Sequence, residues 1–96
     1  MPTYVILSRI APGAFSNPGE FRKIAAEVSE KIKSWCPGVI WKDSYGTLGN
    51  YDVVDIVESD DPKQIQRAAI IIRSYGHADT ETLPATPWKE FLKNLE

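Results

Sequence analysis

The segment TLGNYDVVDIVE, residues 47–58, contains the pattern that decides the fold. Gly49 and Asn50 tolerate the positive φ angles that a two-residue hairpin turn needs. The residues on either side of this pair are rich in β-branched and aromatic types, which are typical of strands. The segment therefore predicts a tight turn that joins a strand over Val39–Thr47 to an antiparallel partner over Tyr51–Glu58.

Two stretches with the apolar spacing of amphipathic helices flank this hairpin. The first begins at Asn17-Pro18 and ends at Pro37-Gly38, and the second begins at Asp61-Pro62 and ends at Gly76. Asparagine and aspartate are good N-caps, and proline fits the first helical position because its missing N–H would have no partner there. The sequence therefore predicts one helix before the hairpin and one after it.

Strands are also expected near the two ends of the chain. Thr3–Ser8 and His77–Leu83 have strand character, Pro84–Pro87 is typical of a linker, and Trp88–Leu95 has the spacing of a short helix. The element order is then β-α-β-β-α-β plus a terminal helix, which is the split βαβ arrangement of ferredoxin-like α+β sandwiches. We expect residues 1–96 to form a single domain, with two helices on one face of the sheet and a second copy of the chain covering the other face.

Composition narrows the classes of function. The formal net charge is −2 with no basic cluster, which argues against nucleic acid and anionic membranes as partners. The sequence has one cysteine, no apolar segment of membrane-spanning length and no signal peptide, so we expect a cytoplasmic protein. One histidine and one cysteine without ligand spacing give no metal site, and the sequence leaves the cofactor unknown.

The run Leu48-Gly-Asn-Tyr-Asp52 resembles the GYD-domain family of small bacterial and archaeal proteins, which is named for a glycine, a tyrosine and an aspartate at this hairpin. Here Asn50 intervenes between the glycine and the Tyr-Asp pair. The similarity extends to the opening Met1-Pro-Thr-Tyr-Val, to Ile56-Val-Glu58 and to Thr80-Glu-Thr-Leu83. The resemblance implies a dimeric α/β-barrel of ferredoxin-like subunits, and it implies no settled activity.

Strand alternation selects the first candidate site. It predicts that Trp41, Asp43 and Tyr45 share one face, with Tyr45 near Val54 and Asp43 near Ile56 on the partner strand. An aromatic ring, a carboxylate and a phenol around a cleft could hold a small organic ligand. The alternative is a solvated strand end with one exposed carboxylate.

Four further residues complete the list of candidates. Asp52 could accept a proton or could cap backbone N–H groups of the turn, and Tyr51 suits packing or a dimer contact. Asp55 lies inside an apolar strand, so it needs a partner such as Arg9 or Lys42 unless it faces a dimer cleft. His77 could be a general base or a haem ligand, or it could be a surface group at a helix–strand junction.

Three functions remain open at this stage. The first is a homodimeric or higher even-numbered oligomer that binds a small molecule, as a sensor or carrier, in the cleft between two sheets. The second is a cofactor-free or haem-using monooxygenase-like enzyme of the dimeric α/β-barrel type, and one histidine neither requires nor excludes haem. The third is an interaction module that binds another protein through its exposed sheet or through an apolar helix face at Ile70.

Overall fold

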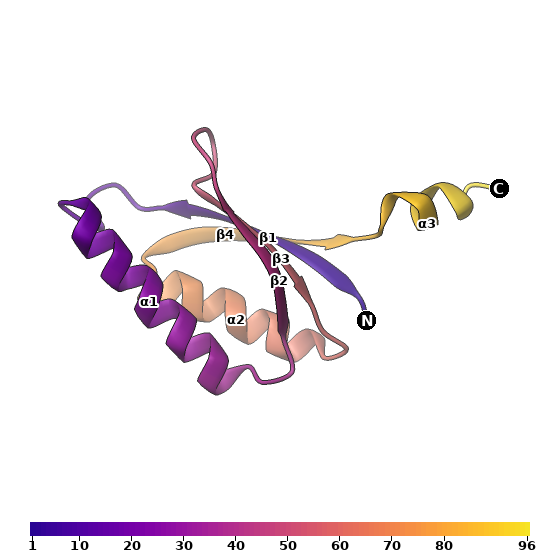
Figure 1. The fold of residues 1–96 in the computed structure, drawn as a ribbon, viewed down its shortest axis with the longest axis horizontal. Helices are drawn as coiled ribbons and strands as arrows, with labels where there is room; N and C mark the ends of the chain where they lie inside the picture. Colours follow the sequence, from indigo (N-terminus) through magenta and orange to yellow (C-terminus); the bar gives the residue numbers. More distant parts are fainter.

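A computed structural model of the protein describes residues 1–96 and contains one four-stranded antiparallel sheet with two helices on one face (Figure 1). The strand order is β2-β3-β1-β4, the order of the ferredoxin-like sandwich that the sequence predicts. The elements in chain order are β1 (Thr3–Ile10), α1 (Pro18–Trp35), β2 (Ile40–Gly46), β3 (Val53–Glu58), α2 (Pro62–Tyr75), β4 (Ala78–Ala85) and α3 (Trp88–Lys93).

Both long helices begin at the caps that the sequence predicts. The Asn17 side chain accepts a hydrogen bond from the Glu20 N–H at 3.0 Å, and the Asp61 carboxylate accepts one from the Lys63 N–H at 2.9 Å. Each cap is followed by proline at the start of the helix. These bonds satisfy N–H groups that have no partner within the helix, so they fix where α1 and α2 begin.

The core lies between the helices and the inner face of the sheet. Alternation along β1 and β3 turns Ile6 and Val57 toward the helices, and both are fully buried. The other buried apolar side chains come mainly from the helices: Ile32, Cys36, Ile65, Ala68, Ile71, Ile72 and Ala78. The outer face of the sheet carries no helix (Figure 1) and exposes large apolar side chains at Ile40, Tyr45 and Leu83.

The connection between β2 and β3 differs from the predicted two-residue turn. The paired residues end at Gly46 and Val53, and neither Gly49 nor Asn50 has a positive φ angle. The longer loop is closed by a hydrogen bond from the Thr47 N–H to the Asp52 carbonyl at 2.9 Å. Contacts with β1 hold it as well, because the Arg9 Nε atom donates to the Asn50 carbonyl at 2.7 Å.

A β-bulge in β2 corrects the predicted arrangement of its side chains. Trp41 pairs with Val57 and Asp43 pairs with Ile56, so the register shifts between them and Lys42 is the extra residue. The pairings of Asp43 with Ile56 and of Tyr45 with Val54 are confirmed. Trp41, however, lies on the helix side of the sheet, whereas Asp43 and Tyr45 lie on the outer face.

The C-terminal part differs in its boundaries. Pro84 and Ala85 belong to β4 rather than to a linker, which an edge strand tolerates because one row of its backbone groups needs no partner. The helix α3 is shorter than predicted and stands away from the sheet and the two long helices (Figure 1). No helix has the length and apolar character needed to cross a membrane.

Candidate functional site

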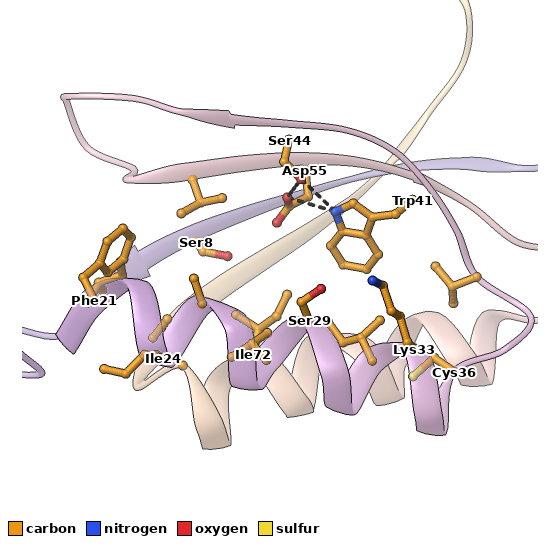
Figure 2. Close-up of a pocket in the computed structure, with 18 residues that line it drawn as sticks. Ser8, Phe21, Ile24, Ser29, Lys33, Cys36, Trp41, Ser44, Asp55 and Ile72 are labelled. Carbon is orange, nitrogen blue, oxygen red and sulfur yellow. Dashed lines mark hydrogen bonds between the residues drawn. The ribbon is translucent and has the colours of Figure 1, made fainter. Parts of the chain in front are cut away.

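A pocket of about 360 Å³ lies between α1 and the inner face of the sheet (Figure 2). Its lining is mostly apolar, and Asp55 and Lys33 are the two charged residues in it. The helix contributes Phe21, Ile24, Ala25, Val28, Ser29, Ile32 and Lys33, and the sheet contributes Ser8, Ile10, Trp41, Ser44, Val53, Asp55 and Ala78. An apolar cavity of this size with a few polar groups is the usual form of a site for a small organic molecule.

Asp55 is the centre of a small polar network in the pocket wall. It is 5% exposed and lies on β3, facing the helices. The Ser44 hydroxyl donates to its Oδ1 atom at 2.5 Å, and the Trp41 indole N–H donates to the same atom at 3.1 Å. The indole N–H also lies 2.9 Å from the Ser44 hydroxyl oxygen, so the three side chains hold one another in place, as the dashed lines in Figure 2 show.

Burial raises the pKa of Asp55 above its usual range, and the hydrogen bonds from Ser44 and Trp41 offset part of that rise. The predicted ion pair with Arg9 or Lys42 is wrong, because the hydrogen-bond partners of the carboxylate are these two neutral donors. A buried carboxyl without a cationic neighbour can hold a proton more easily than an exposed one. Asp55 can therefore act as a hydrogen-bonding group, and as a proton acceptor, toward a molecule in the pocket.

Ser8 places a second polar atom in the same wall. Its side chain is 2% exposed, and its Oγ atom has no hydrogen-bond partner. Buried hydroxyl groups are almost always paired, because leaving one without a partner costs free energy. Figure 2 shows this oxygen directed into the space between the sheet and α1. An unpaired atom at this position marks where a ligand could complete the hydrogen bonding.

Replacing Ser8 with alanine is expected to stabilise the empty protein by about 1 kcal/mol, because the substitution removes a buried hydroxyl that has no partner. Denaturant unfolding measures the change. Ser59→Ala is the matched control: Ser59 is equally buried, but its hydroxyl donates to the Gly38 carbonyl at 2.8 Å and accepts from the Asp61 N–H at 3.0 Å. The control should lose stability. If Ser8→Ala loses as much stability as Ser59→Ala, the Ser8 hydroxyl has a hydrogen-bond partner in solution.

The structure separates the three residues predicted to share a site. Trp41 lines the pocket, but Asp43 and Tyr45 are exposed on the outer face of the sheet. The bulge at Lys42 is the physical cause, because an extra residue reverses the side-chain alternation beyond it. Ser44 takes the inward position that alternation had given to Asp43.

Tyr51, Asp52 and His77 do not line the pocket. The Tyr51 hydroxyl bonds to the Glu81 carboxylate on the outer face, and the Arg9 guanidinium lies 5.6 Å from the Tyr51 ring centre. The Asp52 carboxylate accepts from the Ile10 N–H at 2.8 Å, so it caps the end of β1 rather than the turn. His77 is exposed and has a φ angle of 51° just after α2, where it connects the helix to β4.

Four polar residues of the pocket were not selected from the sequence: Ser8, Ser29, Lys33 and Ser44. A signal existed for Ser8, because it follows the buried Ile6 by two residues and so shares its inward face. Ser44 could not be found without knowledge of the bulge. The Cys36 thiol also lines the pocket, and burial raises its pKa, which disfavours the thiolate. No group of three or more His, Cys, Asp or Glu side chains is placed to hold a metal ion.

The fold and pocket define a ferredoxin-like α+β protein with a buried polar network beneath its first helix. The model of the GYD domain matches residues 4–95, and the chain therefore belongs to the GYD family. The predicted resemblance is confirmed. A relative from Thermus thermophilus, named glutamine synthetase and cystathionine beta-lyase binding protein, is 30% identical over 100 residues and is matched along the full length of both chains.

Two solved structures share the fold. One is a Caulobacter crescentus protein whose name assigns it to the antibiotic biosynthesis monooxygenases; it is 16% identical, has a TM-score of 0.52, and the match covers 90% of this chain and 91% of that one. The other is the de novo designed protein Foldit4, which is 15% identical with a TM-score of 0.52 and coverage of 90% and 96%. Since a designed protein matches as well as a natural one, the likeness supports the fold and no particular reaction.

Proposed function

We propose that the protein binds a small organic molecule in the pocket between α1 and the sheet. The observation that carries this proposal is the cavity of about 360 Å³, whose apolar walls contain a buried carboxyl and a buried hydroxyl without a partner. Natural ligand sites have this size and this mixture of groups. The pocket lies on the helix side of the sheet, so the proposed site differs from the cleft between two sheets in which the sequence placed a small-molecule site.

Filling the pocket should abolish small-molecule binding. Ala25 lines the pocket on α1, and Ala25→Trp would place an indole where a ligand would lie. Ala26→Trp is the control, because both alanines are exposed neighbours on α1 but Ala26 does not line the pocket. Native mass spectrometry of gently purified protein would detect a retained molecule, and ligand-detected NMR with a library of small aromatic and aliphatic compounds would detect weaker binding.

The expected result is binding to the natural protein and to Ala26→Trp, with none to Ala25→Trp. Circular dichroism on both variants would establish that they are folded. Equal binding to the two variants would place the ligand elsewhere. No retained mass and no hit in the library would contradict the proposal.

A second proposed function is binding to another protein, which the name of the Thermus thermophilus relative supports. Its test is calorimetric titration with purified glutamine synthetase and with cystathionine β-lyase from the same source as this chain. If Ala25→Trp still binds one of the enzymes, protein binding is independent of the small-molecule pocket. If neither enzyme gives a heat of binding, the proposed protein-binding function is wrong.

We also propose a homodimer formed through the outer face of the sheet, where Leu83 is 43% exposed. Leu83→Glu should produce monomers, because two copies of the carboxylate would be brought into an apolar interface. Light scattering after size exclusion measures the molar mass. Ile70→Glu is the control, since Ile70 is 58% exposed on α2, on the other side of the molecule. If Ile70→Glu dissociates the protein and Leu83→Glu does not, the interface is the α2 face instead.

A further inference from the structure

Two polar side-chain atoms on the sheet side of the pocket have no hydrogen-bond partner within the protein. One is the Ser8 Oγ atom, and the other is the Asp55 Oδ2 atom, because the hydrogen bonds from Ser44 and Trp41 both end on Oδ1. The pairing of Ile6 with Asp55 places Ser8 and Asp55 on neighbouring strands, on the same face and one step apart along the diagonal. Such positions are about 7 Å apart, so one small group between them can reach both atoms.

The chemistry of this pair selects the group that fits between them. An ionised carboxylate needs a donor, whereas a protonated one can donate as well as accept. The Ser8 hydroxyl can donate or accept. A ligand hydroxyl can also do both, so it satisfies Asp55 in either protonation state, while a carbonyl or an ammonium group satisfies only one state. A hydroxyl therefore matches the inner end of the pocket.

The outer end of the pocket has a positive charge. Lys33 lines the pocket but is exposed, so it lies at the opening, and Figure 2 shows its amino group directed from α1 toward the sheet. It is the pocket's one basic residue, and Asp55 is its one acidic residue. An anionic group on a ligand would be stabilised near Lys33 and would lie away from Asp55. Between the two ends the walls are mainly apolar, with side chains such as Ile24, Val28 and Ile72, and Ser29 of α1 adds one hydroxyl.

We propose that the pocket is selective for a hydroxyl-bearing organic anion: the hydroxyl bonds to Ser8 and Asp55, an apolar body fills the middle, and the anionic group lies beside Lys33. This inference rests on the proposed small-molecule function and adds the class and the orientation of the ligand. It uses the buried unpaired Ser8 Oγ atom, the Asp55 Oδ2 atom that accepts no hydrogen bond, and the position of Lys33. Together these groups give the two ends of the pocket different chemistry.

Three rigid probes test the inference: a hydroxynaphthoate with its hydroxyl and carboxylate at opposite ends, the naphthoate that lacks the hydroxyl, and the hydroxynaphthamide that lacks the charge. Affinities are measured by fluorescence titration. We expect the hydroxynaphthoate to bind about tenfold more tightly than the naphthoate, since one buried hydrogen-bonded group is worth about that factor. It should bind about two- to fivefold more tightly than the hydroxynaphthamide, since an ion pair with an exposed lysine contributes less.

Variants assign each preference to a residue. Ser8→Ala should remove most of the preference for the hydroxyl and leave naphthoate binding unchanged. Lys33→Gln should remove the preference for the carboxylate over the amide, whereas Lys23→Gln, an exposed lysine of α1 outside the pocket, should not. The measured quantity is the ratio of the affinities of two probes for the same variant. A general loss of stability lowers both affinities and therefore does not change this ratio.

The outcomes separate this inference from the proposed function. If the three probes bind equally well and Ala25→Trp removes all of them, the pocket binds small molecules but the inferred ligand class is wrong. If none of the probes binds but the library identifies another ligand that fails to bind Ala25→Trp, the inferred ligand class is wrong. The proposed small-molecule function is then still supported. If Ser8→Ala and Lys33→Gln leave both ratios unchanged, the proposed orientation is wrong.

Discussion

Replacing Gly76 with alanine is expected to lower the free energy of unfolding by about 1–3 kcal/mol, the usual cost of forcing extra atoms into a packed site. Gly76 ends α2, and its N–H donates to the Ile72 carbonyl at 2.8 Å. A Cβ atom at this position would lie 2.4 Å from that carbonyl oxygen and 3.4 Å from the Val28 side chain on α1. The helix end and the carbonyl would have to separate to make room.

The sign of this prediction depends on which of two effects is larger. Gly76 has a φ angle of −90°, which alanine adopts without strain, so the reduced entropy of the unfolded chain alone would stabilise the variant by about 0.4–1 kcal/mol. The overlap with backbone costs more, because a carbonyl fixed in the last turn of a helix cannot move aside as a flexible side chain can. Denaturant unfolding measures the net change.

Gly49→Ala is the control for this experiment. No atom lies within 4 Å of the Cβ that it would add, and its φ angle is not positive. Only the entropy effect remains there, so Gly49→Ala should leave stability unchanged or raise it slightly. Equal effects at the two positions would show that the close approach at Gly76 does not constrain the fold.

The elements that the sequence predicts well are those governed by local chemistry. Asn17 and Asp61 cap their helices as expected, since an N-cap needs only a suitable side chain near the first free N–H groups. The ferredoxin-like order follows from the alternation of two helices and four strands. These features depend on neighbours within a few residues, so one sequence contains enough information for them.

The predictions that were wrong concern features set by residues far apart in the sequence. The bulge at Lys42 changes the face of every later side chain of β2, and the sequence around it contains no glycine or proline to indicate it. The loop after β2 differs from a tight turn because Arg9 and Ser8 on β1 bind its backbone. Asp55 was identified as a buried carboxyl that needs partners, but Ser44 and Trp41 could be identified as those partners only from the register.

Replacing Asp55 tests the polar network and has a larger expected effect than the surface substitutions. Asp55→Ala is expected to cost about 1–3 kcal/mol, because the Trp41 N–H and the Ser44 hydroxyl lose a buried acceptor. Asp55→Asn retains an oxygen at this position and removes the charge. Denaturant unfolding from pH 4 to pH 8 compares both variants with the natural protein.

Asp55→Asn and the natural protein should differ in how their stability depends on pH. Burial raises the pKa of Asp55 in the folded protein, whereas an aspartate in the unfolded chain ionises near about pH 3.9. Above that pH the folded state holds the proton more tightly than the unfolded state, so the contribution of Asp55 is complete at low pH and is lost as the pH rises through the folded pKa. Asp55→Asn cannot lose this contribution.

The asparagine variant should therefore gain stability relative to the natural protein as the pH rises above about 4, and the gain should level off once Asp55 is ionised in the folded state. The other carboxylates titrate equally in both proteins, so the difference isolates Asp55. A difference that does not change with pH would mean that the carboxyl is hydrated through the pocket opening. A difference with the opposite slope would require a cationic neighbour for Asp55, and Lys33, the one basic residue of the pocket, would then have to move inward to it.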